Sequence, residues 1–340
     1  MTQTRKIRTG IIGCDTHGAY YGAMMAEHDA ARLIDPREGK GLGRYTWQSG
    51  GAHFYHYTFY ADRRLMTSPK VYEFEIVKVW DQDRSAAIML SEIFSSKPQV
   101  CESFDQVCRD VDLVFIADCN GSGDTHLEYA TPGLIAGVPT FVDKPFAETY
   151  ADAKAMIKLA DASNTPLMSA SLCHLLPQAV NFRNRLVEVE QLGFGSIRAF
   201  GGCAAAWVHG VALAQNIFGT GIEAVETMGR NQLGHFLLYY PKDSAGPAEG
   251  VMINCDSGPS FHCSLFASAF GSRGAIHSGT LGDFEFPSAA EIVLKDICKM
   301  VRTKKPVFSY ETMLESIAIL EAAKLSQKEK RIVRLSEITG

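Results

Sequence analysis

The sequence has 340 residues, a formal net charge of −5 and a pI of about 6.1. This length favours two domains that each bury a core, and the negative charge excludes a broad basic surface for nucleic acid or anionic lipid. No apolar run reaches the roughly 18 residues of a membrane span, and residues 1–6 leave no room for a signal peptide before the first predicted strand. We therefore expect a cytoplasmic protein with no nucleic-acid or membrane partner.

The first predicted strand ends in a glycine turn that leads into a helix. A dinucleotide-binding turn has the pattern G-x-G-x-x-G, whose glycines allow a tight turn, close approach of the diphosphate and close helix packing. Gly13 and Gly18 hold the outer positions, whereas Asp15 stands where the middle glycine is usual. A carboxylate there repels a diphosphate unless it turns away or caps the helix. The turn is therefore either an ordinary strand-to-helix turn or a modified cofactor turn lined by Gly13, Asp15, Thr16, His17 and Gly18.

The second strand is predicted at residues 74–81 and ends in an acidic residue, Asp81. In dinucleotide folds an acid at this strand end accepts hydrogen bonds from the ribose hydroxyls, usually about 20 residues after the glycine turn. Here the strand comes much later, and no arginine directly follows Asp81 to neutralise a 2′-phosphate. The sequence therefore favours NAD over NADP. The alternative is that Asp81 caps a helix that begins at Arg84.

The rest of the first half alternates between helices and short apolar strands. Helices are predicted at 85–94, 103–108 and up to 135, and strands at 100–101, 112–117 and 139–142. A polar turn at 118–124 precedes the third helix, which Asp124 or Thr125 is expected to cap. The alternation predicts an α/β domain with a doubly wound parallel sheet.

Asp143-Lys144-Pro145 follows the last of these strands and precedes a helix predicted to start at Tyr150. The carboxyl ends of parallel strands face the crevice where such sheets bind ligands. An ammonium group at that place can donate a hydrogen bond to a reacting oxygen, which predicts an active-site role for Lys144. The alternative is a surface lysine beside a proline that starts a helix.

After residue 171 the pattern changes from alternating elements to a run of strands. A helix is predicted at 178–192, and strands at 196–200, 250–254, 260–269, 275–278 and 283–286. Such a run predicts an α+β second domain with a mostly antiparallel sheet. Because one face of an antiparallel sheet is available to pack on a partner, we expect a homodimer or homotetramer.

Taken in order, the glycine turn, the acid after the second strand, the polar turn followed by His126, and Asp143-Lys144-Pro145 resemble the Gfo/Idh/MocA oxidoreductases. The resemblance extends through the helix 151–163 and the strand 166–171 to the C-terminal segments 302–311, 313–326 and 331–335, which are similar to the C-terminal helices of the family. It implies an NAD-binding Rossmann domain at residues 1–147 and an α+β substrate and oligomerisation domain at residues 148–340. The C-terminal helices are expected to pack back on the first domain.

The resemblance also implies roles for single residues of the first domain. The usual family motif is Glu-Lys-Pro, so Asp143 departs from it while the lysine and proline match. Lys144 would hold and polarise the reacting oxygen of the substrate. The remaining cofactor contacts would come from Asn120, His126, Asp143, Lys144 and Pro145.

In the second domain the family carries an Asp-x-Gly-x-His element whose histidine acts as acid or base. The best match here, residues 219–226, places Glu223 at that histidine. Glu223 is therefore either the general base, or a solvated or salt-bridged helix residue in a branch that has lost the chemistry. His174, His209 and His235 are further candidates, and His174 is favoured for substrate contact.

Residues 39–65 form an insertion rich in aromatic side chains and arginines. We expect it to be ordered, either as a lid or substrate wall or as a subunit or intradomain contact. His53 and His56 have no acidic or cysteine partner at ligand spacing, so no metal site is predicted. The nine cysteines include no C-x-x-C pair and indicate buried thiols in a reducing compartment.

The sequence therefore predicts an NAD-dependent dehydrogenase that acts on a sugar, polyol or sugar acid by hydride transfer. Lys144 would polarise the oxygen, and Glu223 or a histidine would take the proton. One alternative is a lyase or hydrolase that uses tightly held NAD for transient oxidation. Another is a non-catalytic sensor that binds the cofactor or a sugar. Steady NADH formation separates the first reading from both alternatives.

Overall fold

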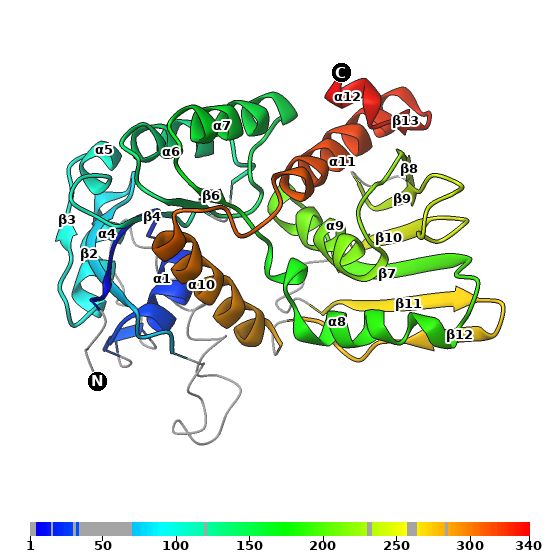
Figure 1. Ribbon diagram of the computed structural model, residues 1–340, viewed down its shortest axis with the longest axis horizontal. Coiled ribbons are helices and arrows are strands. Elements are labelled where there is room, and N and C mark those ends of the chain that lie inside the picture. The colour runs from blue at the N-terminus through cyan, green and yellow to red at the C-terminus, as the bar shows by residue number, and fades with distance from the viewer. Residues whose placement is uncertain are drawn as a thin grey trace. The chain divides into compact units, whose positions relative to one another are not determined.

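The computed structural model describes residues 5–14, 16–29, 32–33, 70–118, 121–229, 233–256, 264–282 and 285–340. The predictions for Asp15, Asn120 and the aromatic insertion 39–65 lie outside these residues. The chain divides into two compact units (Figure 1). Unit 1 comprises Met1–Phe146, Ala155–Ser169 and Ala290–Phe308, and unit 2 comprises Ala147–Lys154, Ala170–Ala289 and Ser309–Gly340.

Unit 1 contains a parallel sheet with the strand order β3-β2-β1-β4-β5-β6. Its strands are β1 (Ile7–Ile12), β2 (Phe74–Trp80), β3 (Gln99–Val100), β4 (Leu113–Ile116), β5 (Thr140–Val142) and β6 (Leu167–Met168). The strand order reverses at β1, which pairs with β2 on one side and β4 on the other. The predicted doubly wound parallel sheet is therefore confirmed.

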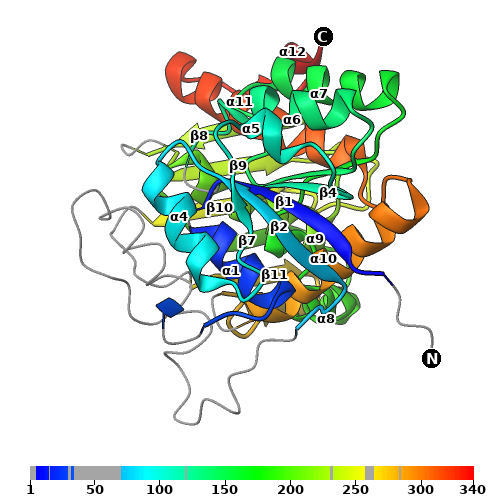
Figure 2. The same cartoon turned by 90° about the vertical axis from the view of Figure 1, so that its left-hand side faces the viewer.

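Helices cover both faces of this sheet. They are α1 (Thr16–Met25), α4 (Arg84–Ile93), α5 (Phe104–Val107), α6 (His126–Ile135) and most of α10 (Phe286–Thr303), while α7 (Tyr150–Ala162) is shared between the two units. Figures 1 and 2 show α1 and α4 on one face and α5 and α6 on the other. A Cβ on Gly22 of α1 would lie 2.4 Å from the Phe94 ring, so a glycine is needed where α1 meets the end of α4.

The core of unit 1 lies around β4, whose four residues are fully buried. Phe115 of β4 stacks on Phe141 of β5 with ring centroids 4.6 Å apart, and Tyr21 of α1 lies 5.2 Å from Phe115. A parallel strand covered on both faces is expected to be a continuous apolar run, and β4 has this composition. This apolar run is also what predicted the strand at 112–117 from the sequence.

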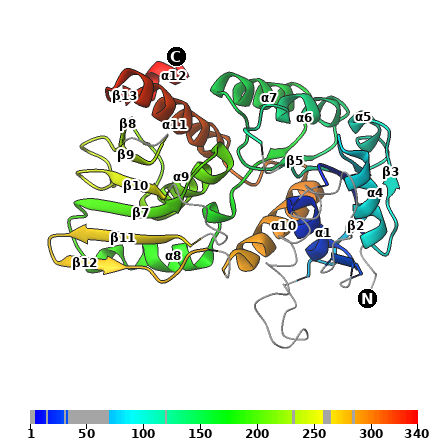
Figure 3. The same cartoon turned by 180° about the vertical axis from the view of Figure 1, so that it is seen from behind.

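Unit 2 contains a seven-stranded sheet with the order β12-β11-β7-β10-β9-β8-β13 (Figure 3). Its strands are β7 (Phe194–Phe200), β8 (Ala224–Met228), β9 (His235–Tyr239), β10 (Val251–Asp256), β11 (Phe266–Gly271), β12 (Gly274–His277) and β13 (Val333–Arg334). The pair β7 and β10 is parallel, and the other pairs of this sheet are antiparallel. This confirms the predicted, mostly antiparallel sheet.

The helices of unit 2 pack on this sheet and on one another. They are α8 (Pro177–Asn184), α9 (Ala204–Phe218), α11 (Tyr310–Glu329) and the short α12 (Ser336–Thr339). Helix α9 contacts β7 and β10, and α11 contacts β8 and α9. A Cβ on Gly210 would lie 2.8 Å from Ile253 and 3.0 Å from Ala199, so this glycine lets α9 approach the sheet closely.

Several predicted elements of unit 2 are wrong in type or extent. The helix predicted at 178–192 ends at Asn184 and is followed by a 3-10 turn, Leu186–Glu188. Phe286 begins α10 instead of ending a strand, and residues 331–335 include strand β13 in place of a helix. Helix α9 was missed because almost all of its residues are buried, so it has no polar face to reveal a helical period.

No helix among the described residues is both long and apolar enough to span a bilayer.

Candidate active site

The glycine turn after β1 packs against the end of β4. Gly13 has a φ of +89°, and a Cβ there would lie 2.9 Å from the main-chain nitrogen of Asp118. A Cβ on Gly18 would lie 2.5 Å from the carbonyl oxygen of Gly13, so the first turn of α1 can approach the loop only with a glycine. Both outer glycines of the predicted pattern are therefore required by conformation or packing.

Asp81 follows β2 and is 5% exposed. Its Oδ2 accepts a hydrogen bond from the Cys14 main-chain N–H (2.7 Å), and its Oδ1 accepts one from the Asp83 N–H (2.8 Å). The N-cap of α4 is Asp83, whose Oδ1 accepts from the Ser85 N–H (3.0 Å), so the alternative that Asp81 caps this helix is wrong. Each carboxylate oxygen has a second lone pair, and the ribose role of Asp81 stays a prediction.

Thr16 begins α1 in the glycine turn and is 7% exposed. Its Oγ1 is buried and has no hydrogen-bond partner among the described residues. A buried hydroxyl without a partner is unfavourable by about 1–3 kcal/mol unless a ligand supplies one. The positive end of the helix and this hydroxyl together fit an anionic diphosphate, as the cofactor prediction requires.

His17 of α1 and Asp143 after β5 form a buried pair. The His17 Nδ1 lies 2.5 Å from the Asp143 Oδ2, and the two residues are 9% and 0% exposed. Burial alone would raise the pKa of the Asp143 carboxyl, but attraction to His17, the hydrogen bond from His17 and the charge of Lys144 hold that pKa below its ordinary value. The pair joins the glycine turn to the segment that carries Lys144.

Lys144 follows Asp143 directly and is 7% exposed. Its main-chain N–H donates to the Asp143 Oδ1 (2.8 Å), so the same carboxylate contacts both His17 and the Lys144 backbone. The Lys144–Pro145 peptide bond is cis. The segment lies at the carboxyl end of β5, in the position that the sequence predicts, and Lys144 is buried rather than a surface lysine.

His126 connects two loops at the same end of the sheet and is 1% exposed. Its Nε2 lies 3.0 Å from the Asp118 carbonyl oxygen, and its Nδ1 lies 3.3 Å from the Phe146 carbonyl oxygen. The ring therefore ties the polar turn after β4 to the segment after β5. Its cofactor contact stays a prediction, and these main-chain contacts give it a structural role.

His174 lies in a short 3-10 helix, Leu172–His174, and both of its ring nitrogens have partners within unit 2. The Ser171 N–H donates to Nδ1 (3.1 Å), and Nε2 lies 2.9 Å from the Gln215 Oε1. An amide oxygen only accepts, so the proton of the neutral ring is on Nε2. Burial lowers the pKa of His174 to about 4, although the hydrogen bond to Gln215 opposes this shift.

Gln215 extends these contacts to a half-buried carboxylate, Glu315 of α11. The Gln215 Nε2 donates to Glu315 Oε2 (2.7 Å), and Glu315 Oε1 accepts from the main-chain N–H groups of Gly221 (2.6 Å) and Ile222 (2.9 Å). Burial raises the pKa of Glu315, while the hydrogen bonds from Gln215 and the two N–H groups oppose this shift. No local sequence pattern predicts this pair, because its two members are 100 residues apart.

His209 lies on α9 and is 4% exposed. Its Nδ1 lies 2.7 Å from the Ser171 Oγ and 3.8 Å from the Cys173 Sγ. Its ring stacks on Phe286 with centroids 5.8 Å apart, and the tilted ring of Phe200 lies at 5.4 Å. The two aromatic rings and Ser171 fix the orientation of the imidazole.

Glu223 lies directly before β8, next to the edge strand β13, and not in a helix. Its N–H donates to the Tyr239 carbonyl (2.8 Å), and its carbonyl accepts from the Leu335 N–H (2.9 Å). Its carboxylate pairs with the Arg334 guanidinium, and the two side chains are 42% and 66% exposed. The ion pair with Arg334 supports the alternative that Glu223 is a salt-bridged residue, and its role as a general base stays a prediction.

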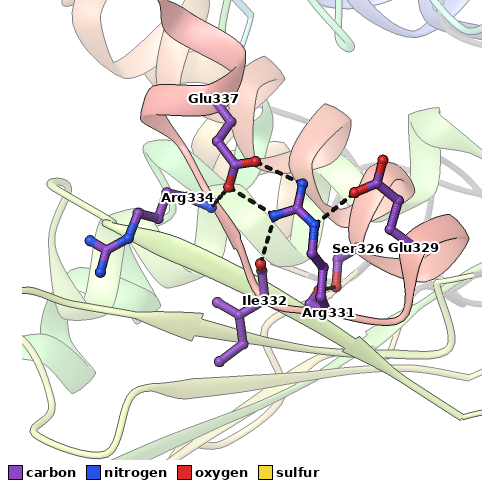
Figure 4. Close-up of polar contacts among 6 residues, drawn as sticks. All are labelled: Ser326, Glu329, Arg331, Ile332, Arg334 and Glu337. Carbon is purple, nitrogen blue, oxygen red and sulfur yellow. Dashed lines mark hydrogen bonds and ion pairs between the residues drawn. The ribbon is translucent and has the colours of Figure 1, made fainter.

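Figure 4 shows the neighbouring residues that hold β13 in place. The Arg331 guanidinium donates to Glu337 and Glu329, and the Glu337 Oε1 also accepts from the Arg334 main-chain N–H (2.9 Å). These hydrogen bonds, first those from Arg331, lower the pKa of Glu337 to about 2. The surroundings of Glu223 are thus an exposed ion-pair cluster.

His235 lies at the start of β9 on the exposed side of the sheet, where its Nδ1 is 3.0 Å from the Asn254 Oδ1. No group of three or more histidine, cysteine, aspartate or glutamate side chains that could hold a metal ion occurs in the part of the chain that the structure describes.

Comparison with known proteins places these features in context. The Gfo/Idh/MocA family model, described as an oxidoreductase family with an NAD-binding Rossmann fold, matches residues 7–171. The matched range includes the glycine turn, Asp81 and Lys144. No curated protein matches the chain.

Solved structures are similar over nearly the whole chain. The scyllo-inositol dehydrogenase from Lactobacillus casei with bound NAD(H) and scyllo-inositol is 12% identical, covers 98% of this chain and 100% of its own, and has a TM-score of 0.70. A myo-inositol dehydrogenase from Corynebacterium glutamicum is 15% identical, with coverage of 97% and 99% and a TM-score of 0.67. An oxidoreductase from Agrobacterium radiobacter, in complex with NAD+, L-tartaric acid and magnesium, is 14% identical, with coverage of 98% and 99% and a TM-score of 0.66. At these identities the likeness shows a shared fold.

Proposed function

We propose that this chain, whose residues 7–171 match the Gfo/Idh/MocA oxidoreductase family model, is a member of that family and an NAD-dependent dehydrogenase of a sugar, polyol or sugar acid. The observation that carries the proposal is the His17–Asp143 contact of 2.5 Å, which joins the glycine turn and the Lys144 segment within unit 1. A cofactor-binding turn and a buried lysine at one end of a parallel sheet are the parts that a hydride-transfer site needs.

The cofactor half of the proposal is supported by the glycine turn. The N-terminus of α1, where the Thr16 hydroxyl lacks a partner among the described residues, would hold the diphosphate, and Asp81 would accept hydrogen bonds from the ribose hydroxyls. When bound, NAD supplies the hydride acceptor or donor. Lys144 donates a hydrogen bond to the reacting oxygen, and its positive charge stabilises the developing alkoxide.

For the proton we propose His209 among the candidates of unit 2. Glu223 is paired with Arg334 at an exposed sheet edge, and His174 has both ring nitrogens engaged and a pKa lowered to about 4 by burial. A group with so low a pKa is a weak base near neutral pH. His209 is buried, and the contact of its Nδ1 with the Ser171 Oγ orients an imidazole that is suited to exchange a proton near neutral pH.

The substrate class is supported by the structural neighbours. Two of them are inositol dehydrogenases, and a third is an oxidoreductase in complex with L-tartaric acid. Polyols and hydroxy acids share a secondary carbinol carbon whose oxidation releases one hydride and one proton. The proposal covers this class and does not single out one compound.

The test is a screen of cyclic polyols, aldoses and aldonic acids with NAD+, in which NADH absorbance and product are both followed. We expect steady NADH formation with at least one compound. Lys144→Met should then lower turnover by about 10²-fold, the usual scale for one acid or base group, while exposed Lys158→Met on α7 should not. Product without net NADH would favour the lyase or hydrolase alternative, and binding without turnover of any compound would favour the sensor.

His209 and Glu223 are separated in the same assay. We expect His209→Gln to lower turnover by about 10²-fold or more and Glu223→Gln to leave it nearly unchanged. A loss in Glu223→Gln that shifts the pH profile, with normal turnover in His209→Gln, would return the proton transfer to Glu223.

A further inference from the structure

Ser171 contacts both histidines that follow β6. Its main-chain N–H donates to the His174 Nδ1 (3.1 Å), and its Oγ lies 2.7 Å from the His209 Nδ1. The residue is 1% exposed, and its Oγ also accepts from the Cys173 N–H (3.2 Å) as the cap of the 3-10 helix. One buried serine thus fixes the environment of two imidazoles that differ in role.

We infer that Ser171 is the positioning residue of His209 and keeps the imidazole oriented throughout proton transfer. This inference rests on the proposed function, because it concerns the histidine that exchanges the proton with the substrate oxygen. A serine hydroxyl both donates and accepts, whereas a carboxylate only accepts. It can therefore donate to Nδ1 when that nitrogen is unprotonated and accept from Nδ1–H when the ring carries a proton there.

The hydrogen bonds around Ser171 support this role. The Cys173 N–H occupies one acceptor site of the Oγ and fixes the position of the oxygen, so the hydroxyl can turn while the oxygen stays in place. The Asn216 Nδ2 donates to the Cys173 carbonyl (2.9 Å), which ties the 3-10 helix to α9, the helix that carries His209. The distance between Ser171 and His209 is thus set by the main chain on both sides.

His174 contributes to the same arrangement as a neutral residue. Its Nδ1 accepts from the Ser171 N–H, and its Nε2 donates to Gln215, which in turn donates to Glu315. Glu315 is anchored by the Gly221 and Ile222 N–H groups. This chain of hydrogen bonds holds the Ser171 backbone against α9 and α11, so a change of the Ser171 side chain alone tests the hydroxyl.

The simpler reading is that Ser171 only caps the 3-10 helix. Ser326 of α11 provides a matched control for this reading (Figure 4). It is 0% exposed, its Oγ accepts from the Thr227 N–H (2.9 Å), and its hydroxyl donates to the Arg331 carbonyl (2.6 Å). Each serine therefore accepts one main-chain hydrogen bond in a buried place, but Ser326 has no hydrogen bond to a histidine among the residues that the structure describes.

The first measurement is the ¹⁵N NMR spectrum of protein labelled at histidine, with the His209 signals assigned by their loss in His209→Gln. We expect Ser171→Ala to change the Nδ1 and Nε2 shifts of His209, because the tautomer balance is no longer set by the hydroxyl. Ser171→Thr, which keeps both the hydroxyl and the cap, and Ser326→Ala should keep the wild-type shifts. Unchanged His209 shifts in folded Ser171→Ala would overturn the inference.

The second measurement is kinetic and uses whichever substrate the screen yields. Ser171→Ala should lower kcat by about 10-fold to 100-fold at nearly constant KM, and Ser171→Thr should restore most of it. An equal loss in Ser326→Ala, or no loss in Ser171→Ala, would overturn the inference.

Failure of the proposed function is visible separately. It would show as absence of NADH formation by the unmodified protein, whereas the NMR shifts report on Ser171 and His209 without any substrate.

Discussion

The Asp143 carboxylate contacts His17 through Oδ2 at 2.5 Å and the Lys144 main-chain N–H through Oδ1 at 2.8 Å, so one buried side chain joins the glycine turn to the lysine segment. His17 and Asp143 are far apart in the sequence and come from α1 and from the loop after β5. Because the carboxylate accepts from both sides, the position of the Lys144 backbone depends on the position of α1.

Loss of the His17 partner should destabilise the protein. His17→Gln removes the imidazole that contacts the buried Asp143 carboxylate, and the loss of a hydrogen-bond partner of a buried polar group costs about 1–3 kcal/mol. Urea unfolding at neutral pH measures this loss in the free energy of unfolding. His28→Gln is the control, since the His28 Nδ1 lies 3.1 Å from the Ala26 main-chain carbonyl oxygen. A loss below about 1 kcal/mol would mean that the pair adds little to stability.

The stability that comes from Asp143 has a defined pH dependence. Its folded-state pKa is lowered, so the contribution is fully present above the unfolded-state pKa of about 3.9 and is lost as the pH falls through the folded-state pKa. Asp143→Asn should remove this part of the acid dependence.

Thr16→Val should separate cofactor affinity from stability. Valine has nearly the same shape and removes a buried hydroxyl that has no partner among the described residues, so the free energy of unfolding should stay equal or rise. Affinity for NAD should fall by about 5-fold to 10-fold, the equivalent of one hydrogen bond of roughly 1 kcal/mol. Calorimetric titration checks it. The control is Thr140→Val in β5, which removes a hydroxyl that donates to the Val138 carbonyl and should leave the affinity for NAD unchanged. Equal NAD affinities of the unmodified protein and both variants would place the diphosphate elsewhere.

Asp81 should set the preference for NAD over NADP. Its carboxylate repels a 2′-phosphate, so the unmodified protein should bind NAD at least about 10-fold more tightly than NADP. Asp81→Asn should reduce this ratio. Asp83→Asn is the matched control, because asparagine caps α4 as well as aspartate does and the nearby charge changes equally. Tighter binding of NADP than of NAD by the unmodified protein would rule out the ribose role of Asp81.

His174 should make unfolding sensitive to mildly acidic pH. Its pKa is lowered by burial to about 4 in the folded protein and is about 6.5 in the unfolded chain. The unfolded state therefore binds more protons between these values, and stability should decrease by up to about 3 kcal/mol as the pH falls from 6.5 to 4. Urea unfolding across this range measures the slope. His174→Gln should show a smaller slope, and identical slopes would show that His174 titrates as it does in the unfolded chain.

The sequence was sufficient for the sheet of unit 1 because short strands alternate with helices along the chain and β4 is a continuous apolar run. Asp81, Gly13 and Lys144 could be placed at strand ends for the same reason. Unit 2 was harder, since α9 is buried on nearly all sides and carries no amphipathic pattern. The start of α10 at Phe286 also follows residues that were predicted as a strand.

The polar contacts of the site depend on residues that no local pattern joins. His17 and Asp143 are 126 residues apart in the sequence, and Gln215 and Glu315 are 100 residues apart. Ser171 was predicted only as the last residue of the strand 166–171, and its contact with His209 depends on how α9 packs against the 3-10 helix that follows. Glu223 was matched to the catalytic histidine of the family by sequence spacing alone. The structure places Glu223 next to a strand and not in a helix, which this spacing could not reveal.

Helix α10 makes the boundary of unit 1 differ from the boundary that the family match suggests. The match ends at residue 171, yet Ala290–Phe308 belongs to the same compact unit. Ala290, Val293, Leu294 and Ile297 of this helix are all 0% exposed. A fragment that ends at residue 171 would therefore keep every cofactor-site residue named here. It would lack α10, so the apolar residues that pack against this helix would be exposed to solvent and the fragment would be prone to aggregate. The family model matches one continuous stretch of sequence, but the folded unit that contains this stretch also needs residues 290–308.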